Sequence, residues 1–127
     1  MESESSPLVL VVDDDPAVRD SLCAVLASAG YRTLTAENGS DAIGQLAARP
    51  DLVLTDVNMA GSSGLEVINA IRFGGANIPV IAMSGWRPAA GYDPLEIARK
   101  LGAAQVLRKD KMEDLLSVIE QVLHAPK

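Results

Sequence analysis

The chain contains a single cysteine, Cys23, so it cannot form an internal disulfide, which fits a reducing compartment. No apolar run approaches the roughly 20 residues that a helix needs to cross a bilayer. The chain begins with MESESS, which is acidic and polar, the opposite of the basic start of a secretory signal. Basic residues are also scarce, with 11 Lys and Arg against 17 Asp and Glu, and the net charge of −6 disfavours direct binding to nucleic acid. These absences predict a soluble cytoplasmic protein that neither inserts into a membrane nor contacts nucleic acid directly.

The length and composition of the chain fit one domain. A chain of 127 residues leaves little room for a second domain, and a hydrophobic fraction of 48% is ample for one core. We therefore expect a single domain over residues 1–127, with its core at about 8–123 and flexible ends at 1–6 and 124–127.

Five short runs rich in apolar and β-branched residues have the character of buried strands. Three of these runs are almost entirely apolar, which is typical of parallel strands that are covered on both faces. The expected strands are Leu8–Val12, Arg32–Ala36, Leu52–Thr55, Ile78–Met83 and Gln105–Leu107.

Helical patterns lie between the expected strands. Apolar residues recur at helical spacing over residues 18–29 and 112–123. The pairs Asp15-Pro16 and Asp93-Pro94 each place a capping acid before a proline at the first helical position. The capping-box spacing of 110–113, Asp to Glu, predicts a further helix start. Strands alternating with helices predict an α/β fold, a doubly wound, five-stranded parallel sheet with five flanking helices and right-handed crossovers.

Polar residues follow four of the expected strands, at the edge where a doubly wound sheet binds its ligands. Asp13 and Asp14 follow the first strand, and Asp56 follows the third. Ser84 follows the fourth strand and Lys109 follows the fifth. Because the carboxyl ends of parallel strands lie at one edge of a sheet, we expect these side chains to converge.

The chemistry of this set points to a metal ion and a phosphoryl group. Closely spaced carboxylates in a crevice are unfavourable unless a cation joins them, and an all-oxygen site with room for water suits Mg²⁺. A hydroxyl and an ammonium group nearby can hold the remaining phosphoryl oxygens. The set therefore predicts phosphoryl transfer onto a carboxylate, with an acyl phosphate as the product.

With these residues in this order, the chain resembles the receiver domain of two-component response regulators, a family with the flavodoxin-like fold. The resemblance runs from Leu8 to about Leu123 and is strongest over DLVLTDVNMAGSSGLEVI, residues 51–68. It implies that Asp56 is the phosphoacceptor. The other site residues that it implies are Ser84 and Lys109 beside the phosphoryl group, and Asp13, Asp14, Asp56 and the backbone carbonyl of Asn58 as ligands of Mg²⁺.

The resemblance also implies partners and a role in signalling. The phosphoryl donor would be a phosphohistidine on a bacterial sensor histidine kinase or histidine phosphotransfer protein. The chain would act as a phosphoacceptor signalling domain and not as an enzyme, in the manner of single-domain, chemotaxis-regulator-like receivers. Its output would be a protein–protein contact, and homodimer formation stays open.

Three positions depart from the usual pattern of the family. Val106 stands on the fifth strand where an aromatic side chain usually couples phosphorylation to a rotamer change. Ala60 replaces a proline in the loop after the phosphoacceptor. Asp110 replaces the proline that usually follows the lysine through a cis bond. A cis bond without proline costs roughly 3 kcal/mol, so we expect a trans peptide and a reshaped loop after Lys109.

Two other functions remain open at this stage. Asp13 and Asp15 have the spacing of the nucleophile and acid of haloacid-dehalogenase-type phosphatases, and 110–114 supplies a late pair of acids. Against this interpretation, Pro16 makes Asp15 look like a helix cap, and Asp56 would have no role. The second alternative is a non-phosphorylated pseudo-receiver that serves only as a binding module.

Overall fold

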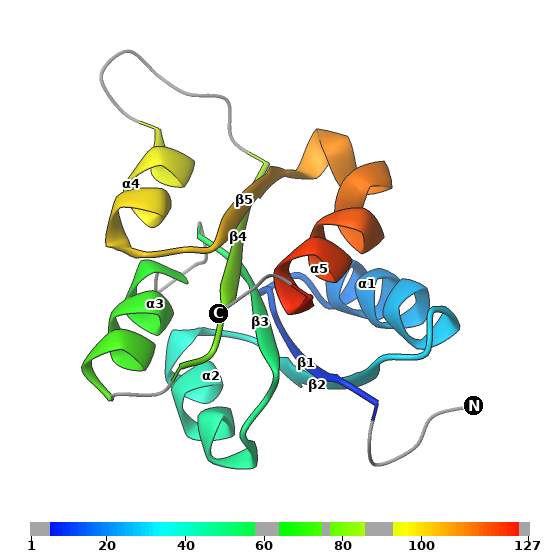
Figure 1. Ribbon diagram of the computed structural model, residues 1–127, viewed down its shortest axis with the longest axis horizontal. Coiled ribbons are helices and arrows are strands. Elements are labelled where there is room, and N and C mark those ends of the chain that lie inside the picture. Colours follow the sequence, from blue (N-terminus) through cyan, green and yellow to red (C-terminus); the bar gives the residue numbers. More distant parts are fainter. Residues whose placement is uncertain (1–5, 58–63, 75–76, 86–92, 125–127) are drawn as a thin grey trace.

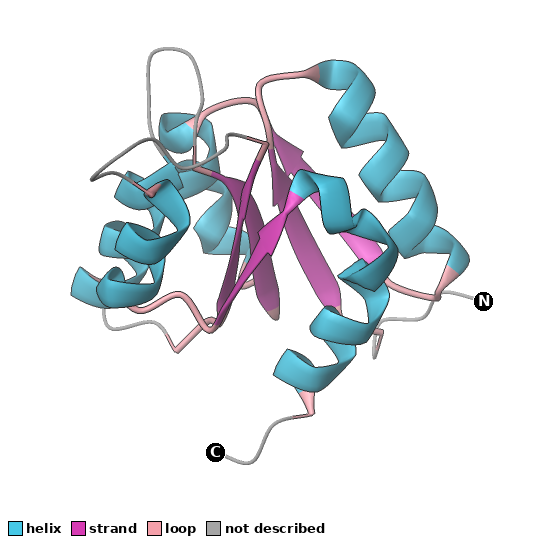
Figure 2. Cartoon of the chain, turned by 90° about the horizontal axis from the view of Figure 1, so that it is seen from above, coloured by secondary structure: helices cyan, strands magenta, loops and turns pink. Residues whose placement is uncertain are grey.

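The computed structural model describes residues 6–57, 64–74, 77–85 and 93–124. A five-stranded parallel sheet runs through the centre of the molecule between two layers of helices (Figure 2). The strands are β1 (Leu8–Val12), β2 (Arg32–Ala36), β3 (Leu52–Asp56), β4 (Val80–Ser84) and β5 (Gln105–Arg108). The α-helices are α1 (Pro16–Ser28), α2 (Gly39–Gln45), α3 (Gly64–Phe73), α4 (Pro94–Leu101) and α5 (Leu115–Leu123), with 3₁₀ helices η1 (Leu46–Ala48) and η2 (Lys109–Asp114).

The strand order confirms the predicted doubly wound sheet. The order is β2-β1-β3-β4-β5, and every pairing is parallel. The chain first places β2 on one side of β1 and then crosses to β3 on the other side. The order therefore reverses between β1 and β3, which is where such sheets bind their ligands.

Alternating strand residues supply two separate apolar layers. Figure 1 shows α1 and α5 on one side of the sheet and α2, α3 and α4 on the other. Leu22 and Leu26 of α1 pack with Val9 and Val11 of β1 on the first side. Leu10 and Val12 of β1 belong to the apolar layer on the second side. Because both faces are covered, β3 and β4 are buried along their whole length and β1 is buried at every residue after Leu8, as their apolar sequences predict.

Capping carboxylates start α1 and α4 as predicted. The Asp15 side chain accepts a hydrogen bond from the backbone N–H of Ala17 at 2.9 Å. The Asp93 side chain accepts one from the N–H of Leu95 at 3.0 Å. At the other end of α4, Gly102 adopts a φ of 114°, a left-handed conformation that glycine tolerates best. Both Asp-Pro pairs thus begin helices in the way that the sequence indicates.

The predicted helix start at Asp110 is wrong. The chain leaves β5 directly into η2, and α5 begins only at Leu115. Lys111, at φ −122° and ψ 33°, interrupts the helical backbone within η2. The carboxylate of Asp110 is instead paired with the guanidinium of Arg108 at 3.1 Å. The described residues contain no cis peptide bond, so the expected trans bond after Lys109 is confirmed.

The longest helix in the described part of the chain is α1, with 13 residues. No described helix has both the length and the apolar character required to cross a bilayer.

Candidate functional site

Asp13, Asp56 and Lys109 reach the same side of the sheet from three different strands. Each stands two positions after a strand residue that packs against α1 and α5, and side chains alternate along a strand with period two. The β1–β3 register pairs Val12 with Thr55, so Asp13 and Asp56 follow at the ends of neighbouring strands. The sheet therefore brings together residues that are far apart in the sequence.

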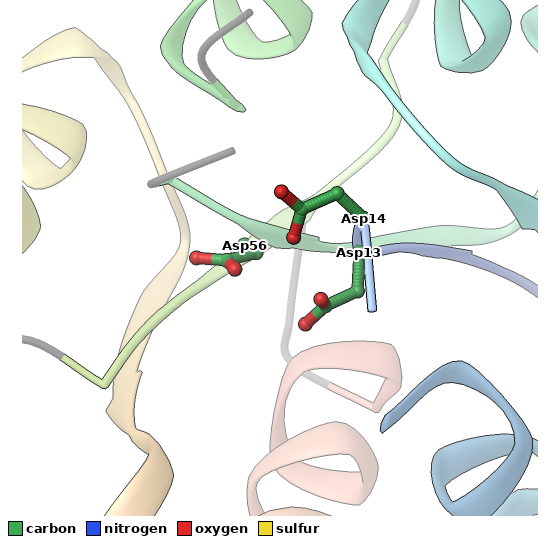
Figure 3. Close-up of side chains that lie close together, drawn as sticks. All are labelled: Asp13, Asp14 and Asp56. Carbon is green, nitrogen blue, oxygen red and sulfur yellow. The ribbon is translucent and has the colours of Figure 1, made fainter. Parts of the chain in front are cut away.

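Three carboxylates form one acidic cluster at this edge. An oxygen from each of Asp13, Asp14 and Asp56 lies within 4.8 Å of the others. Figure 3 shows their side chains extending into a common space, two from the end of β1 and one from β3. Asp13 is 0% exposed and Asp56 is 4% exposed, whereas Asp14 is open to solvent. The cluster therefore combines a desolvated wall with one accessible side, an arrangement that suits a hard cation with water ligands.

The ammonium group of Lys109 joins the two buried carboxylates. Its Nζ donates to Oδ2 of Asp13 at 2.8 Å and to Oδ2 of Asp56 at 3.0 Å. Burial alone lowers the pKa of Lys109, but the hydrogen bonds and negative charges of Asp13 and Asp56 outweigh this effect, and the pKa is raised. Lys109 is therefore a cation at neutral pH and compensates part of the negative charge of the cluster.

Asp13 is held at several atoms besides this ion pair. Its Oδ1 accepts the backbone N–H of Asp15 at 3.0 Å, and its own N–H donates to the carbonyl of Ala36 at 3.2 Å. Its carbonyl oxygen accepts a hydrogen bond from Nη1 of Arg19 at 2.6 Å. Hydrogen bonds therefore fix both the backbone and the carboxylate of Asp13.

Ser84 lies at the same edge of the sheet. It is the last residue of β4, is 1% exposed, and follows Met83, the β4 partner of Asp56. A β-carbon placed on the next residue, Gly85, would lie 3.5 Å from Cδ of Lys109, so the lysine stem passes beside the end of this strand. The predicted residue Asn58 lies outside the described residues, and its role as a ligand remains a prediction.

Asp15 is separate from the acidic cluster. Its side chain is exposed and caps α1, as the sequence predicts. The phosphatase interpretation requires Asp15 as a catalytic acid beside Asp13. Its engagement with the N–H of Ala17 gives that interpretation no support.

Two further residues touch the site and were not predicted from the sequence. A β-carbon on Gly64, the first residue of α3, would lie 2.1 Å from the carbonyl oxygen of Asp56. Gly64 therefore allows α3 to begin directly against the backbone of Asp56. A glycine in the first turn of a helix, where its helix propensity is low, is the available sequence signal. Arg19 offers a similar signal, because a cation is disfavoured in the first turn of a helix.

Comparison with known proteins agrees with this geometry. Residues 9–120 match the model of the family described as the response regulator receiver domain. The transcriptional regulatory protein FixJ of Azorhizobium caulinodans is 42% identical over 111 residues, which cover 84% of this chain and 49% of FixJ. The chain spans between 24% and 49% of the length of FixJ and three other curated relatives that it matches.

Solved structures of response regulator proteins have the same fold as this chain. The signal receiver domain of the putative response regulator NarL from Mycobacterium tuberculosis is 26% identical, with a TM-score of 0.83, covering 95% of this chain and 98% of that one. The chemotaxis protein CheY4 of Vibrio cholerae is 27% identical, with a TM-score of 0.82, covering 93% and 99%. With its flavodoxin-like fold and its acidic site at the β1–β3 switch point, the chain belongs to the response regulator receiver domain family.

Proposed function

We propose that the chain accepts a phosphoryl group on the carboxylate of Asp56 from a phosphohistidine donor, with Mg²⁺ bound by Asp13, Asp14 and Asp56. One observation carries the proposal. The three carboxylates have oxygens within 4.8 Å of one another, and the Lys109 ammonium is hydrogen-bonded to two of them. Neither a helix cap nor a surface turn requires this combination of acids and a cation.

The positions of these side chains support the following transfer step. An oxygen of Asp56 attacks phosphorus, the P–N bond of the donor breaks, and its electron pair returns to the imidazole nitrogen. The product is an acyl phosphate on Asp56. Lys109 is placed to pair with a phosphoryl oxygen because it already contacts Asp56, and the Ser84 hydroxyl, at the end of the neighbouring strand, supplies a further donor.

The donor set also fits a magnesium ion. Asp13 and Asp14 are carboxylates without a nitrogen or sulfur ligand beside them in the described cluster, and the exposed side at Asp14 leaves room for water. When bound, Mg²⁺ supplies charge neutralisation for the carboxylates and the phosphoryl oxygens. The backbone carbonyl of Asn58 belongs to this proposed ligand set.

The partners in this proposal are a sensor histidine kinase or a histidine phosphotransfer protein in the cytoplasm. Their phosphohistidine would supply the group that Asp56 accepts. The output would be a change in contacts with other proteins and not a turnover reaction. Phosphotransfer from each candidate kinase, followed as the rate of Asp56 labelling, would identify the cognate donor.

Acetyl phosphate provides a direct test that needs no kinase. We expect intact-mass spectrometry to show the gain of one phosphoryl group in the presence of MgCl₂ and no gain after chelation with EDTA. Asp56→Asn should abolish labelling. Asp20→Asn, which changes an exposed carboxylate on α1, is the matched control and should label like the wild type.

The same experiment separates the alternatives. Repeated turnover of acetyl phosphate that survives Asp56→Asn and is lost in Asp13→Asn would support a phosphatase and contradict this proposal. A folded wild-type chain that binds neither Mg²⁺ nor a phosphoryl group would instead be a pseudo-receiver.

A further inference from the structure

We infer that Thr55 is a positioning residue for the phosphoacceptor, because its hydroxyl holds the backbone carbonyl of Asp56. The inference rests on the proposed function, in which Asp56 accepts a phosphoryl group. Thr55 follows Val53 of the layer beneath α2, α3 and α4, whereas Asp56 follows Leu54 of the layer beneath α1 and α5. The inference therefore assigns Thr55 no contact with the metal or the phosphoryl group.

The Thr55 hydroxyl is a buried polar group between two apolar neighbours. Thr55 is 0% exposed, and Val53 and Val57, two positions before and after it, belong to the apolar layer on that side of the sheet. Valine has nearly the same branched shape as threonine and suits a strand equally well. Burying a hydroxyl is unfavourable unless it forms a hydrogen bond. Packing alone would thus be served by valine, and the hydroxyl has a different use.

This use is a hydrogen bond to the phosphoacceptor itself. Oγ1 of Thr55 donates to the carbonyl oxygen of Asp56 at 3.0 Å, and both groups are buried. The N–H of Val57, which belongs to the same peptide unit, donates to the carbonyl of Met83 on β4 at 3.0 Å. Because a peptide unit is planar, these two bonds fix the plane that leaves the α-carbon of Asp56.

The first residue of α3 lies against this hydrogen bond. A β-carbon on Gly64 would lie 2.1 Å from the carbonyl oxygen of Asp56 and 2.9 Å from Oγ1 of Thr55. Close packing of this kind excludes water, and a hydrogen bond in a dry environment is electrostatically stronger than one in water. The carbonyl of Asp56 is therefore held in a shielded position between β3 and α3.

Asp56 is thus held from both faces of the sheet, by two contacts that differ during the reaction. Lys109 donates to the Asp56 carboxylate at 3.0 Å, but in the proposed transfer it pairs with a phosphoryl oxygen, so its hold on the carboxylate changes. The Thr55 contact lies on the other face and is not involved in that exchange. Attack on phosphorus depends on the placement of the carboxylate, and the Thr55 hydroxyl maintains the backbone from which that carboxylate extends.

Two substitutions of Thr55 separate positioning from packing. Thr55→Val keeps the shape and removes the hydroxyl, whereas Thr55→Ser keeps the hydroxyl and removes the methyl group. A packing role predicts that Thr55→Ser impairs the site, because it leaves a small cavity. A positioning role predicts that Thr55→Val slows labelling of Asp56 and that Thr55→Ser restores it, even though the cavity lowers Tm.

The test measures the maximal rate of labelling of the full chain by acetyl phosphate, at saturating MgCl₂ and well below Tm, with intact-mass spectrometry as the readout. We expect Thr55→Val to label about fivefold more slowly than the wild type, the size of effect expected when one neutral hydrogen bond no longer contributes to the transition state. Thr55→Ser should label at the wild-type rate. Thr35→Val, the same substitution at an exposed position on β2, is the matched control and should also label at the wild-type rate.

Unchanged labelling by Thr55→Val would overturn the inference, as would an equal loss of rate in Thr55→Ser or in Thr35→Val. If Thr55→Val does not fold by circular dichroism, Thr55→Ala is measured against the same criteria, and failure of both to fold would mean a purely structural role. A wild-type chain that gains no phosphoryl group on Asp56 would overturn the proposed function, and this inference with it. A wild type that is labelled at the same rate as Thr55→Val overturns this inference alone.

Discussion

The ammonium nitrogen of Lys109 lies 3.0 Å from Oδ2 of Asp56, a residue 53 positions earlier in the chain. The same nitrogen contacts Asp13, so one cation serves two carboxylates that are almost completely buried. Two like charges in a desolvated space are unfavourable without such a partner. Lys109 thus compensates the charge of two buried carboxylates, besides its proposed role beside the phosphoryl group.

Replacing Lys109 with glutamine should lower both stability and phosphoryl acceptance. The free energy of unfolding should fall by about 1–3 kcal/mol, somewhat less than the loss for a fully buried ion pair, because a quarter of the Lys109 side chain is exposed. Denaturant unfolding without Mg²⁺ measures this change in the free energy of unfolding. Labelling with acetyl phosphate measures the rate at which Asp56 accepts a phosphoryl group, which should fall. Lys111→Gln is the matched control, since Lys111 is an exposed lysine two residues away. Equal effects of the two substitutions would contradict the assignment to Lys109.

The Lys109 contribution should disappear at alkaline pH. The pKa of Lys109 is raised in the folded chain, so its stabilising effect is complete below the unfolded-state pKa and is lost as the pH rises through the folded-state value. We expect the stability difference between the wild type and Lys109→Gln to be constant from about pH 7 to pH 9 and to shrink above about pH 10.4. A difference that begins to shrink on going from neutral to pH 9 would show that the pKa is lowered instead.

Neutralising either acid after β1 should weaken Mg²⁺ binding. Asp13→Asn and Asp14→Asn each remove one charge from the cluster, and we expect a loss of at least about tenfold, or about 1.4 kcal/mol, by titration calorimetry. Asp15→Ser is the control, because serine can also cap α1 and the Asp15 side chain is outside the cluster. If Asp15→Ser weakened binding as much as Asp14→Asn, the separation of cap and metal ligands would be wrong.

Two glycine substitutions should differ sharply. Gly64→Ala would place a β-carbon 2.1 Å from the Asp56 carbonyl oxygen, and no side-chain rotation can relieve a clash with backbone. We expect a loss of about 1–3 kcal/mol or more in thermal unfolding and slower labelling of Asp56. Gly85→Ala is the comparison, because its β-carbon would lie in ordinary contact, 3.5 Å from the flexible stem of Lys109. Comparable stability of the two variants would show that α3 can shift without disturbing Asp56.

The sheet and the caps were predictable because they depend on local patterns. All five strands lie within two residues of their predicted limits, since apolar runs and their polar ends define them. The start of α1 at Asp15 was predictable because an acid followed directly by a proline is a local signal for a helix start. The closeness of Asp13 and Asp56 was also predictable, because the carboxyl ends of parallel strands lie at one edge of a sheet.

Other features depend on geometry that no short segment contains. The start of α5 was predicted at Asp110, but the carboxylate there pairs with Arg108, and η2 comes first. The closeness of Gly64 to Asp56 depends on how α3 packs on β3, and periodicity gives no information on that distance. The Arg19 contact likewise depends on the angle between α1 and the end of β1.

The pairing of Val12 with Thr55 has a consequence for how this site can change in evolution. One residue inserted between Val12 and Asp13 would turn Asp13 to the opposite face of the sheet, although every carboxylate would still be present in the sequence. The same insertion between α1 and β2 would leave the pairing of β1 with β3 untouched. We therefore expect insertions and deletions in the segments that lead from a helix to the next strand to preserve the site. At the carboxyl ends of the strands such changes should destroy it, so the spacing there should be conserved as strictly as the acids themselves.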